Sequence, residues 1–268
     1  MRALSLALLL AFATPAYAAP FQTKAPYALL IDHNTGKTLF AKNANANMAP
    51  ASTTKILTAE VIFSLLASGK LGVDDKFAIS AHAATEGDAK SGGSSMFAAA
   101  GAHIKIDDLL SGMLTDSGND AAIALAEGVA GSEAKFAGLM NAHARAIGMA
   151  HSRFSNPWGR AGNRVTASDM ARLAAYVIST YPQYYKYFGL PEFTWNGIRQ
   201  PNRNPLLAEG ADGLKTGHLA STGFGLVASA VAGGHRLILV INGLKSEAER
   251  ASEGRRLLEY GKAALGGG

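Results

Sequence analysis

Residues 50–59 read PASTTKILTA and place Ser52 and Lys55 three positions apart, directly after a proline. The residues that follow, up to Leu66, are apolar almost all the way round a helix. This pattern predicts a helix over residues 52–68 that is buried in the core. A lysine is costly to bury unless it is paired or its pKa is shifted. The stretch therefore predicts a core helix whose first turn holds a lysine in an unusual environment.

The segments on either side of this helix predict one antiparallel sheet. Residues 26–33 and 37–42 flank a Gly-containing turn and predict a β-hairpin, and a second hairpin is predicted around Gly233-Gly234. The predicted strands near the C-terminus are 192–199, 212–217, 222–231 and 236–243, and the remaining predicted helices are 106–114, 119–130, 133–147, 167–180 and 247–263. Strands at both ends predict an α+β fold, with a sheet of N- and C-terminal strands covered by helices and a helical lobe to one side.

The first 18 residues have the pattern of a secretory signal peptide. Arg2 gives a positive start, residues 4–13 are apolar, and Ala16-Tyr17-Ala18 supplies small residues at the cleavage positions. The apolar run is too short to span a bilayer as a mature helix. We expect cleavage after Ala18, export to a bacterial periplasm and a single domain over residues 19–268.

Composition narrows the class of function. The 268 residues carry a net charge of +5, which fits an anionic neighbourhood such as a cell wall. The sequence contains no cysteine, which excludes disulfides and thiolate chemistry. Basic residues form no stripe with interleaved aromatics, so no nucleic-acid partner is expected. No cofactor or metal is expected either. The sequence has no nucleotide-binding glycine fingerprint, and His143 and His151 are too far apart for one helical metal face.

Three short motifs occur in an informative order. A lone Ser-x-x-Lys proves little, because residues 132–135 repeat it where a helix N-cap is predicted. Lys-Ser/Thr-Gly also occurs twice, at residues 90–92 in a loop-like stretch and at residues 215–217 entering a strand. Only the series 52–55, then Ser-Gly-Asn at 117–119, then 215–217 runs from a helix through an interhelical loop to a strand. These three elements are therefore expected to converge on one cleft.

The residue types suit nucleophilic catalysis. A serine hydroxyl needs a base, and Lys55 shares a helix face with Ser52. Lys55 can act as that base only when neutral, which burial and a second cation, for which Lys215 is the candidate, would favour. Ser117 can relay a proton to a leaving amine, while Asn119 can orient Lys55 and a substrate amide. The backbone N–H groups of Ser52 and His218 are the candidate donors to a developing oxyanion.

These elements, together with "KTGH", resemble the serine D-alanyl-D-alanine carboxypeptidases, the low-molecular-mass penicillin-binding proteins. The resemblance runs from about residue 25 to 262 and includes "SGGSSMF", "DSGNDAA", "FSNPWG" and "NRNPLL". It implies acylation of the serine by peptidoglycan stem peptides that end in D-Ala-D-Ala, loss of D-Ala, and hydrolysis. It also implies that β-lactams trap the acyl-enzyme.

Carried over to matching positions, the resemblance implies a nucleophile, a base and a set of substrate contacts. The catalytic residues would be Ser52, Lys55, Ser117 and Asn119, and the substrate-binding residues Lys215, Thr216, Gly217, His218, Arg203 and Arg250. The two arginines stand where the family has guanidinium groups near the terminal carboxylate of the substrate. Either could instead be a surface or sheet-packing residue.

The sequence departs from many relatives in two places. They continue into a β-rich domain and a membrane-bound amphipathic helix, whereas this chain stops at Gly268, so neither feature nor a stable membrane anchor is expected. They also often have His-Gly or Asp-Gly where this chain has Trp158-Gly159, and His-x-Ser where it has residues 163–166. The second change alters the loop beside the cleft and leaves the peptide preference open.

Three other functions compete with a carboxypeptidase. The missing second domain favours a D,D-endopeptidase that cleaves crosslinks, while His218 and Arg203 favour the carboxypeptidase. A β-lactamase needs a carboxylate to activate water, but Glu192 follows Ser117 too late in the chain and is expected at a strand edge. A non-catalytic wall-fragment sensor is the third alternative, for which no signalling feature is visible.

Overall fold

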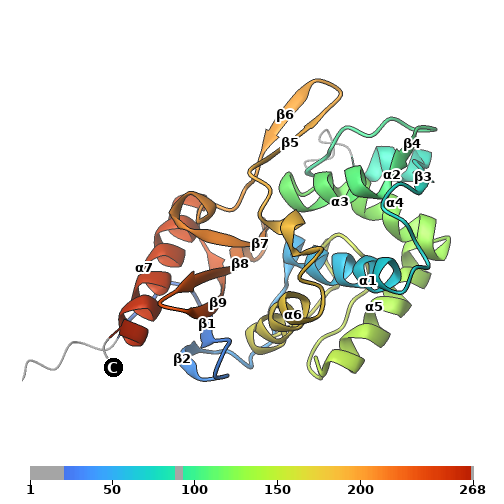
Figure 1. The fold of residues 1–268 in the computed structure, drawn as a ribbon. Helices are drawn as coiled ribbons and strands as arrows, with labels where there is room; N and C mark the ends of the chain where they lie inside the picture. Colours follow the sequence, from blue (N-terminus) through green and yellow to red (C-terminus); the bar gives the residue numbers. More distant parts are fainter. Residues whose placement is uncertain (1–20, 88–92, 267–268) are drawn as a thin grey trace, which may run out of the picture.

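The computed structural model describes residues 21–87 and 93–266. The predicted signal peptide and the Lys-Ser-Gly of residues 90–92 lie outside the described residues. Figure 1 shows a sheet with its covering helix on one side of the molecule and a lobe of helices on the other.

One antiparallel sheet joins the two ends of the chain. Its strand order is β2-β1-β9-β8-β7, so the N-terminal hairpin pairs with the C-terminal strands through β1 and β9. The register places Tyr27 opposite Asn242 and Asp32 opposite Leu237. The strands are β1 (Tyr27–Asp32), β2 (Thr38–Lys42), β7 (Ala211–Leu219), β8 (Gly223–Ala232) and β9 (His235–Leu244). The predicted α+β fold and both predicted hairpins are confirmed.

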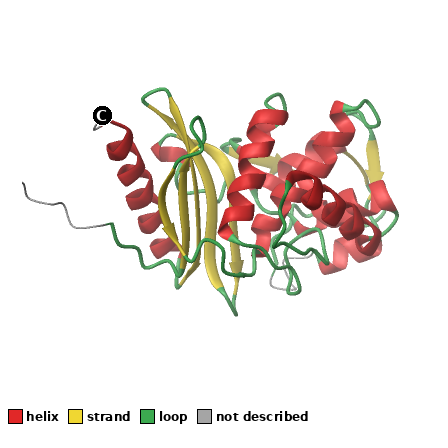
Figure 2. Cartoon of the chain, turned by 90° about the horizontal axis from the view of Figure 1, so that it is seen from below, coloured by secondary structure: helices red, strands yellow, loops and turns green. Residues whose placement is uncertain are grey.

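Helices cover both faces of this sheet. The helix α7 packs on one face and α6 on the other, and Figure 2 shows the strands lying between helices on both sides. Each face has its own apolar core, because strand side chains alternate between the two faces. The helices are α1 (Lys55–Ala67), α2 (Ala81–Glu86), α3 (Ile106–Thr115), α4 (Asn119–Ala130), α5 (Glu133–Ile147), α6 (Ala167–Thr180) and α7 (Glu247–Gly266).

The helix predicted over residues 52–68 is buried as expected, but it begins differently. A short 3-10 helix covers Ala51–Thr54, and α1 starts at Lys55. Every residue of α1 from Lys55 to Phe63 is buried, because α3, α4, α5 and α6 all contact it. The 3-10 helix Ala51–Thr54, which contains Ser52 and is called the serine turn below, therefore lies where the helical lobe meets the sheet.

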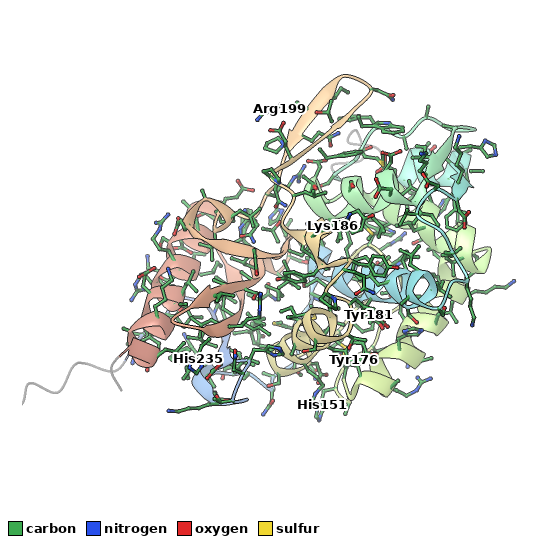
Figure 3. The ribbon with its side chains drawn as sticks, in the orientation of Figure 1. His151, Tyr176, Tyr181, Lys186, Arg199 and His235 are labelled. Atoms are coloured by element: carbon green, nitrogen blue, oxygen red, sulfur yellow. The ribbon has the colours of Figure 1, made fainter. Side chains whose placement is uncertain are left out.

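The strand predicted over residues 192–199 is wrong. The chain forms a hairpin instead, with β5 (Glu192–Trp195) antiparallel to β6 (Ile198–Pro201). Asn196 and Gly197 have φ angles of 50° and 76°, which a tight hairpin turn requires and which Asn-Gly adopts readily. The hairpin projects away from the sheet, as β5 and β6 in Figure 1 and Arg199 in Figure 3 show.

Two smaller differences concern the rest of the chain. The last helix continues to Gly266, beyond the predicted end at residue 263. A short pair of strands, β3 (Lys76–Ala78) and β4 (His103–Lys105), joins the helical lobe and was not predicted. Across residues 21–87 and 93–266, no helix is both long and apolar enough to cross a membrane.

Candidate active site

Ser52 and Lys55 meet at the start of α1. Lys55 is fully buried, and its Nζ lies 3.1 Å from Ser52 Oγ. Ser52 itself is only partly buried and lines a cavity of about 410 Å³. The 3-10 turn thus holds the hydroxyl at the cavity while the lysine reaches it from the protein interior.

The loop between α3 and α4 supplies the second pair of predicted residues. Lys55 Nζ lies 2.7 Å from Asn119 Oδ1 and 3.5 Å from Ser117 Oγ. Ser117 has a φ of 74°, a left-handed conformation that is uncommon for a residue with a Cβ. The backbone N–H of Asn119, the first residue of α4, donates to Ser94 O at 2.8 Å. The loop therefore directs two polar side chains at the same amine.

The third motif lies on β7, which packs directly against the serine turn. Thr216, Gly217 and His218 line the cavity, and Lys215 is 2 % exposed beneath them. A Cβ on Gly217 would lie 2.8 Å from Pro50 O, so only glycine allows the strand to come this close. The three motifs therefore converge as the sequence predicts.

Burial sets the electrostatics of the two lysines. Desolvation, followed by the charges of Lys215 and Arg203, holds the pKa of Lys55 well below its ordinary value. Desolvation and then the charge of Arg203 lower the pKa of Lys215 to about 7. The charge of Lys215 is thus one of the causes that favour the neutral form of Lys55. A neutral Lys55 has a lone pair that can take the proton of Ser52.

Both predicted arginines line the cavity, but their partners differ. Arg203 donates to Asp116 Oδ1 at 2.8 Å and 3.1 Å and to Ser94 Oγ at 2.6 Å, which occupies most of its guanidinium group. Arg250 is 6 % exposed, and its nearest carboxylate is that of Glu247 at 3.7 Å. The Nε of Arg250 has no hydrogen-bond partner among the described residues. Arg250 is therefore the arginine with unused donors beside the cavity.

The sequence did not reveal one contact at the centre of the site. The backbone carbonyl of Trp158 accepts from Lys55 Nζ at 2.8 Å. The segment around it is held against the 3-10 turn and α1, since Asn163 Nδ2 donates to Thr54 Oγ1 at 3.0 Å and Thr58 Oγ1 donates to Pro157 O at 2.5 Å. A backbone contact leaves no residue-type signal, so "FSNPWG" indicated only the loop.

The residues that the sequence analysis set aside lie elsewhere. Ser132 caps α5, and its Oγ accepts from the Lys135 N–H at 3.3 Å, which confirms the predicted N-cap. Glu192 starts β5, forms an ion pair with Arg199 and does not line the cavity. His143 Nδ1 lies 2.9 Å from Glu60 Oε2. Figure 3 shows His151 and His235 well separated from each other. Within the described part of the chain, no three His, Cys, Asp or Glu residues form a metal-binding group.

Comparisons with solved structures define the class of protein. The chain superposes with a TM-score of 0.87 on the D-alanyl-D-alanine carboxypeptidase DacD from Francisella tularensis, at 34 % identity, covering 94 % of this chain and 73 % of that one. It also resembles penicillin-binding protein D2 from Listeria monocytogenes in its ampicillin-bound form, with a TM-score of 0.77 and 28 % identity over 91 % of this chain and 99 % of that one. The fold is that of the penicillin-binding proteins.

Sequence comparisons identify the family. The profile of the D-alanyl-D-alanine carboxypeptidase family, peptidase family S11, matches residues 13–246. The D-alanyl-D-alanine carboxypeptidase DacC of Escherichia coli is 41 % identical over 266 residues, which cover 95 % of this chain and 66 % of that protein. The chain thus spans slightly less than two thirds of this relative's length. It belongs to the D-alanyl-D-alanine carboxypeptidase family.

Proposed function

We propose that the protein is a serine D-alanyl-D-alanine carboxypeptidase that acts on peptidoglycan stem peptides. Ser52 attacks the carbonyl of the penultimate D-Ala, the terminal D-Ala leaves, and water hydrolyses the acyl-enzyme. The observation that carries the proposal is the buried Lys55, whose Nζ lies 3.1 Å from Ser52 Oγ while its pKa is held well below the ordinary value. Such a lysine serves as a general base and has no need of a carboxylate partner.

The other predicted residues have matching roles in this proposal. Ser117, 3.5 Å from Lys55 Nζ, passes the proton to the leaving amine, and Asn119 holds both the lysine and the substrate amide. The backbone N–H groups of Ser52 and His218 stabilise the oxyanion. Thr216 and Gly217 line the opposite wall of the cleft, and Lys215 is buried beneath them.

The terminal carboxylate of the substrate is assigned to Arg250 ahead of Arg203. Arg250 has a buried Nε without a hydrogen-bond partner among the described residues, whereas Arg203 is already bonded to Asp116 and Ser94. A carboxylate is the natural partner for such a guanidinium group. Arg203 then acts mainly by holding the loop that carries Ser117.

β-Lactams are proposed to acylate the same serine. The ampicillin-bound relative with this fold supports this proposal. A labelled penicillin should attach to wild-type protein, and Ser52→Ala should abolish the labelling, because the nucleophile is gone. Ser132→Ala, which alters the second Ser-x-x-Lys, is the matched control and should label normally. Labelling that persists in Ser52→Ala contradicts the proposal.

A D,D-endopeptidase is the second candidate, because a cleft that holds a D-Ala-D-Ala end can also take a crosslinked peptide. The proposed use of Arg250 favours the carboxypeptidase, since only a terminal residue offers a free carboxylate. The two activities are separated by incubating the protein with a muropeptide pentapeptide and with crosslinked dimers. Release of D-Ala from the pentapeptide supports the carboxypeptidase, whereas cleavage of dimers without release of D-Ala supports the endopeptidase.

The proposal includes the location of the enzyme. Residues 1–18 have the pattern of a signal peptide, which supports export across the inner membrane and work in the periplasm as one domain over residues 19–268. N-terminal sequencing of the exported protein tests this, with a mature start directly after Ala18 as the expected result.

A further inference from the structure

Trp158 connects the interior of the site with the outer surface of the helical lobe. Its backbone carbonyl accepts from Lys55 Nζ at 2.8 Å. Its indole Nε1 donates to Glu133 Oε2 at 2.9 Å. Glu133 begins α5, a helix that contributes no predicted site residue. One residue thus contacts the proposed base through its backbone and a distant helix through its side chain.

The carbonyl matters because of the geometry of a neutral amine. Neutral Lys55 has two N–H bonds and one lone pair. The Trp158 carbonyl oxygen and Asn119 Oδ1 lie 2.8 Å and 2.7 Å from Nζ, so each can accept one N–H. The lone pair is then left for the hydroxyl proton of Ser52, at 3.1 Å. Two fixed acceptors therefore orient the base, and loss of either one removes one of the two contacts that do so.

The indole is held on its outer side as well. Glu133 has a side chain that is 17 % exposed, and its Oε1 lies 2.8 Å from His82 Nε2 on α2. A carboxylate in the first turn of α5 is also favoured by the helix dipole, which keeps it in place. The guanidinium group of Arg160 lies 5.7 Å from the centre of the indole ring. The side chain of Trp158 is therefore fixed by a partly buried charged acceptor and by a cation.

The adjoining backbone holds the same peptide unit from one side. Gly159 has a φ of 99°, and a Cβ there would lie 2.0 Å from Ala51 O, so the chain turns sharply against the serine turn. The Gly159 N–H, which belongs to the same peptide unit as the Trp158 carbonyl, donates to Asn156 Oδ1 at 2.8 Å. The hydrogen bond of the indole fixes Trp158 from the opposite side.

We propose that Trp158 and Glu133 are positioning residues for the proposed base. The hydrogen bond between the indole and the carboxylate holds the Trp158 carbonyl against Lys55 Nζ, so that the lone pair of Nζ points at Ser52. The inference rests on the proposed function. It assigns a role to a tryptophan beside the three motifs and to a glutamate outside them. In the reaction the Ser52 proton moves to Lys55 Nζ as the serine oxygen bonds to the substrate carbonyl carbon.

The test compares acylation by a labelled penicillin in wild type, Trp158→Phe, Glu133→Ala, Glu133→Gln and the double variant Trp158→Phe/Glu133→Ala. Trp158→Phe removes the indole N–H and keeps an aromatic ring. It should lower the acylation rate constant roughly three- to tenfold, with the non-covalent binding constant measured separately because Trp158 also lines the cavity. Glu133→Ala should lower the rate constant equally, and the double variant should be no slower than either single variant. Glu133→Gln, which keeps an acceptor oxygen, should retain most of the rate.

A pH profile separates positioning from general damage. A carbonyl that accepts from the amine favours the protonated lysine, so its displacement lowers the pKa of Lys55 further. The acidic limb of the acylation profile should therefore move to lower pH in Trp158→Phe, with an unchanged melting temperature. Trp195→Phe is the matched control, because it makes the same chemical change on the β5–β6 hairpin, and its rate and profile should match wild type.

The outcomes are distinguishable. Rates within twofold of wild type in Trp158→Phe, additive losses in the double variant, or equal losses in Glu133→Gln and Glu133→Ala overturn the inference and leave the proposed function in place. A lower rate that is accompanied by a lower melting temperature and an unmoved pH profile also overturns it. Wild-type protein that takes no label at Ser52 overturns the proposed function and the inference with it.

Discussion

The chain contains the Ser-x-x-Lys pattern at the start of two helices, and the two copies have different surroundings. Lys55 is fully buried and has four oxygen atoms within 3.5 Å of its Nζ. Lys135 is exposed, and the first residue of its pattern, Ser132, caps its own helix at 3.3 Å. Spacing brings the serine and lysine onto one helix face in both cases. Burial and neighbouring oxygens make only the first copy a candidate for catalysis.

The two helices that carry these copies also contact each other. His143 on α5 lies 2.9 Å from Glu60 on α1, and the Glu60 side chain is only 2 % exposed. The only carboxylate of the buried helix α1, that of Glu60, is thus paired with a histidine on α5. The helix α5 therefore supports α1 through His143.

Replacement of each of the two lysines by arginine gives the largest expected difference in acylation rate. Lys55→Arg should lower the acylation rate by about 10²–10⁴-fold, because a guanidinium group stays protonated and cannot take the serine proton. Lys135→Arg should leave the rate unchanged. Acylation by a labelled penicillin measures both, with circular dichroism as the check on folding. A near-normal rate in Lys55→Arg contradicts the assignment of the base.

The pH dependence of acylation sharpens the same comparison. Lys55 acts as a base only when neutral, so the rate should fall as the pH falls through its lowered pKa. Lys215→Met removes the neighbouring cation and should raise the pKa of Lys55, which moves the acidic limb to higher pH. The difference in acylation rate between Lys215→Met and the wild type should be greatest below about pH 7, where Lys215 is charged in the wild type. A limb that stays in place would show that Lys215 has no influence on Lys55.

The contact between the two helices should appear in stability. His143→Ala should lower the free energy of unfolding by about 2 kcal/mol, because buried Glu60 loses its partner. The hydrogen bond to Glu60 raises the pKa of His143 above 6.5, so the contribution of this charge is complete below pH 6.5 and is lost as the pH rises through the raised value. Urea unfolding at about pH 6 and about pH 9 measures this difference.

The matched control for this measurement is His151→Ala, because His151 is an exposed histidine outside the contact. Its free energy of unfolding should follow the wild-type pH dependence. A loss in His143→Ala that is the same at both pH values would contradict the assigned ion pair.

The smallest effect is expected at the second serine. Ser132→Ala should lower the free energy of unfolding by about 1 kcal/mol through loss of the N-cap, with normal acylation. Ser132→Asn should restore the stability, since asparagine caps helices equally well. Thermal and urea unfolding measure both variants, and no loss in Ser132→Ala would show that the 3.3 Å contact contributes little.

Much of the fold was visible in the sequence because its elements have clear periods and breaks. The helices α4, α5 and α6 have the predicted ends, since Gly, Ser and Thr mark them. The β5–β6 hairpin was missed, although its Asn196-Gly197 turn is a strong hairpin signal, because the apolar and aromatic residues on both sides read as one strand. The convergence of the three motifs was predictable from their order.

Other features of the site could not be predicted. The Trp158 carbonyl on Lys55 is a backbone contact, and no residue type encodes it. The different partners of Arg203 and Arg250 depend on where Asp116 and Glu247 lie in space. The indole–carboxylate bond between Trp158 and Glu133 joins positions 25 residues apart on separate elements.

The sequence by itself determined which residues are the candidates for the chemistry and in what order they occur, because motif order and helical or strand context need only local patterns. Only the tertiary structure decided which Ser-x-x-Lys holds a buried lysine and which arginine keeps unused donors. It also decided what holds the lysine's amine towards the serine. These properties depend on desolvation and on distances between separate elements, and both exist only once the lobe of helices has packed against the sheet.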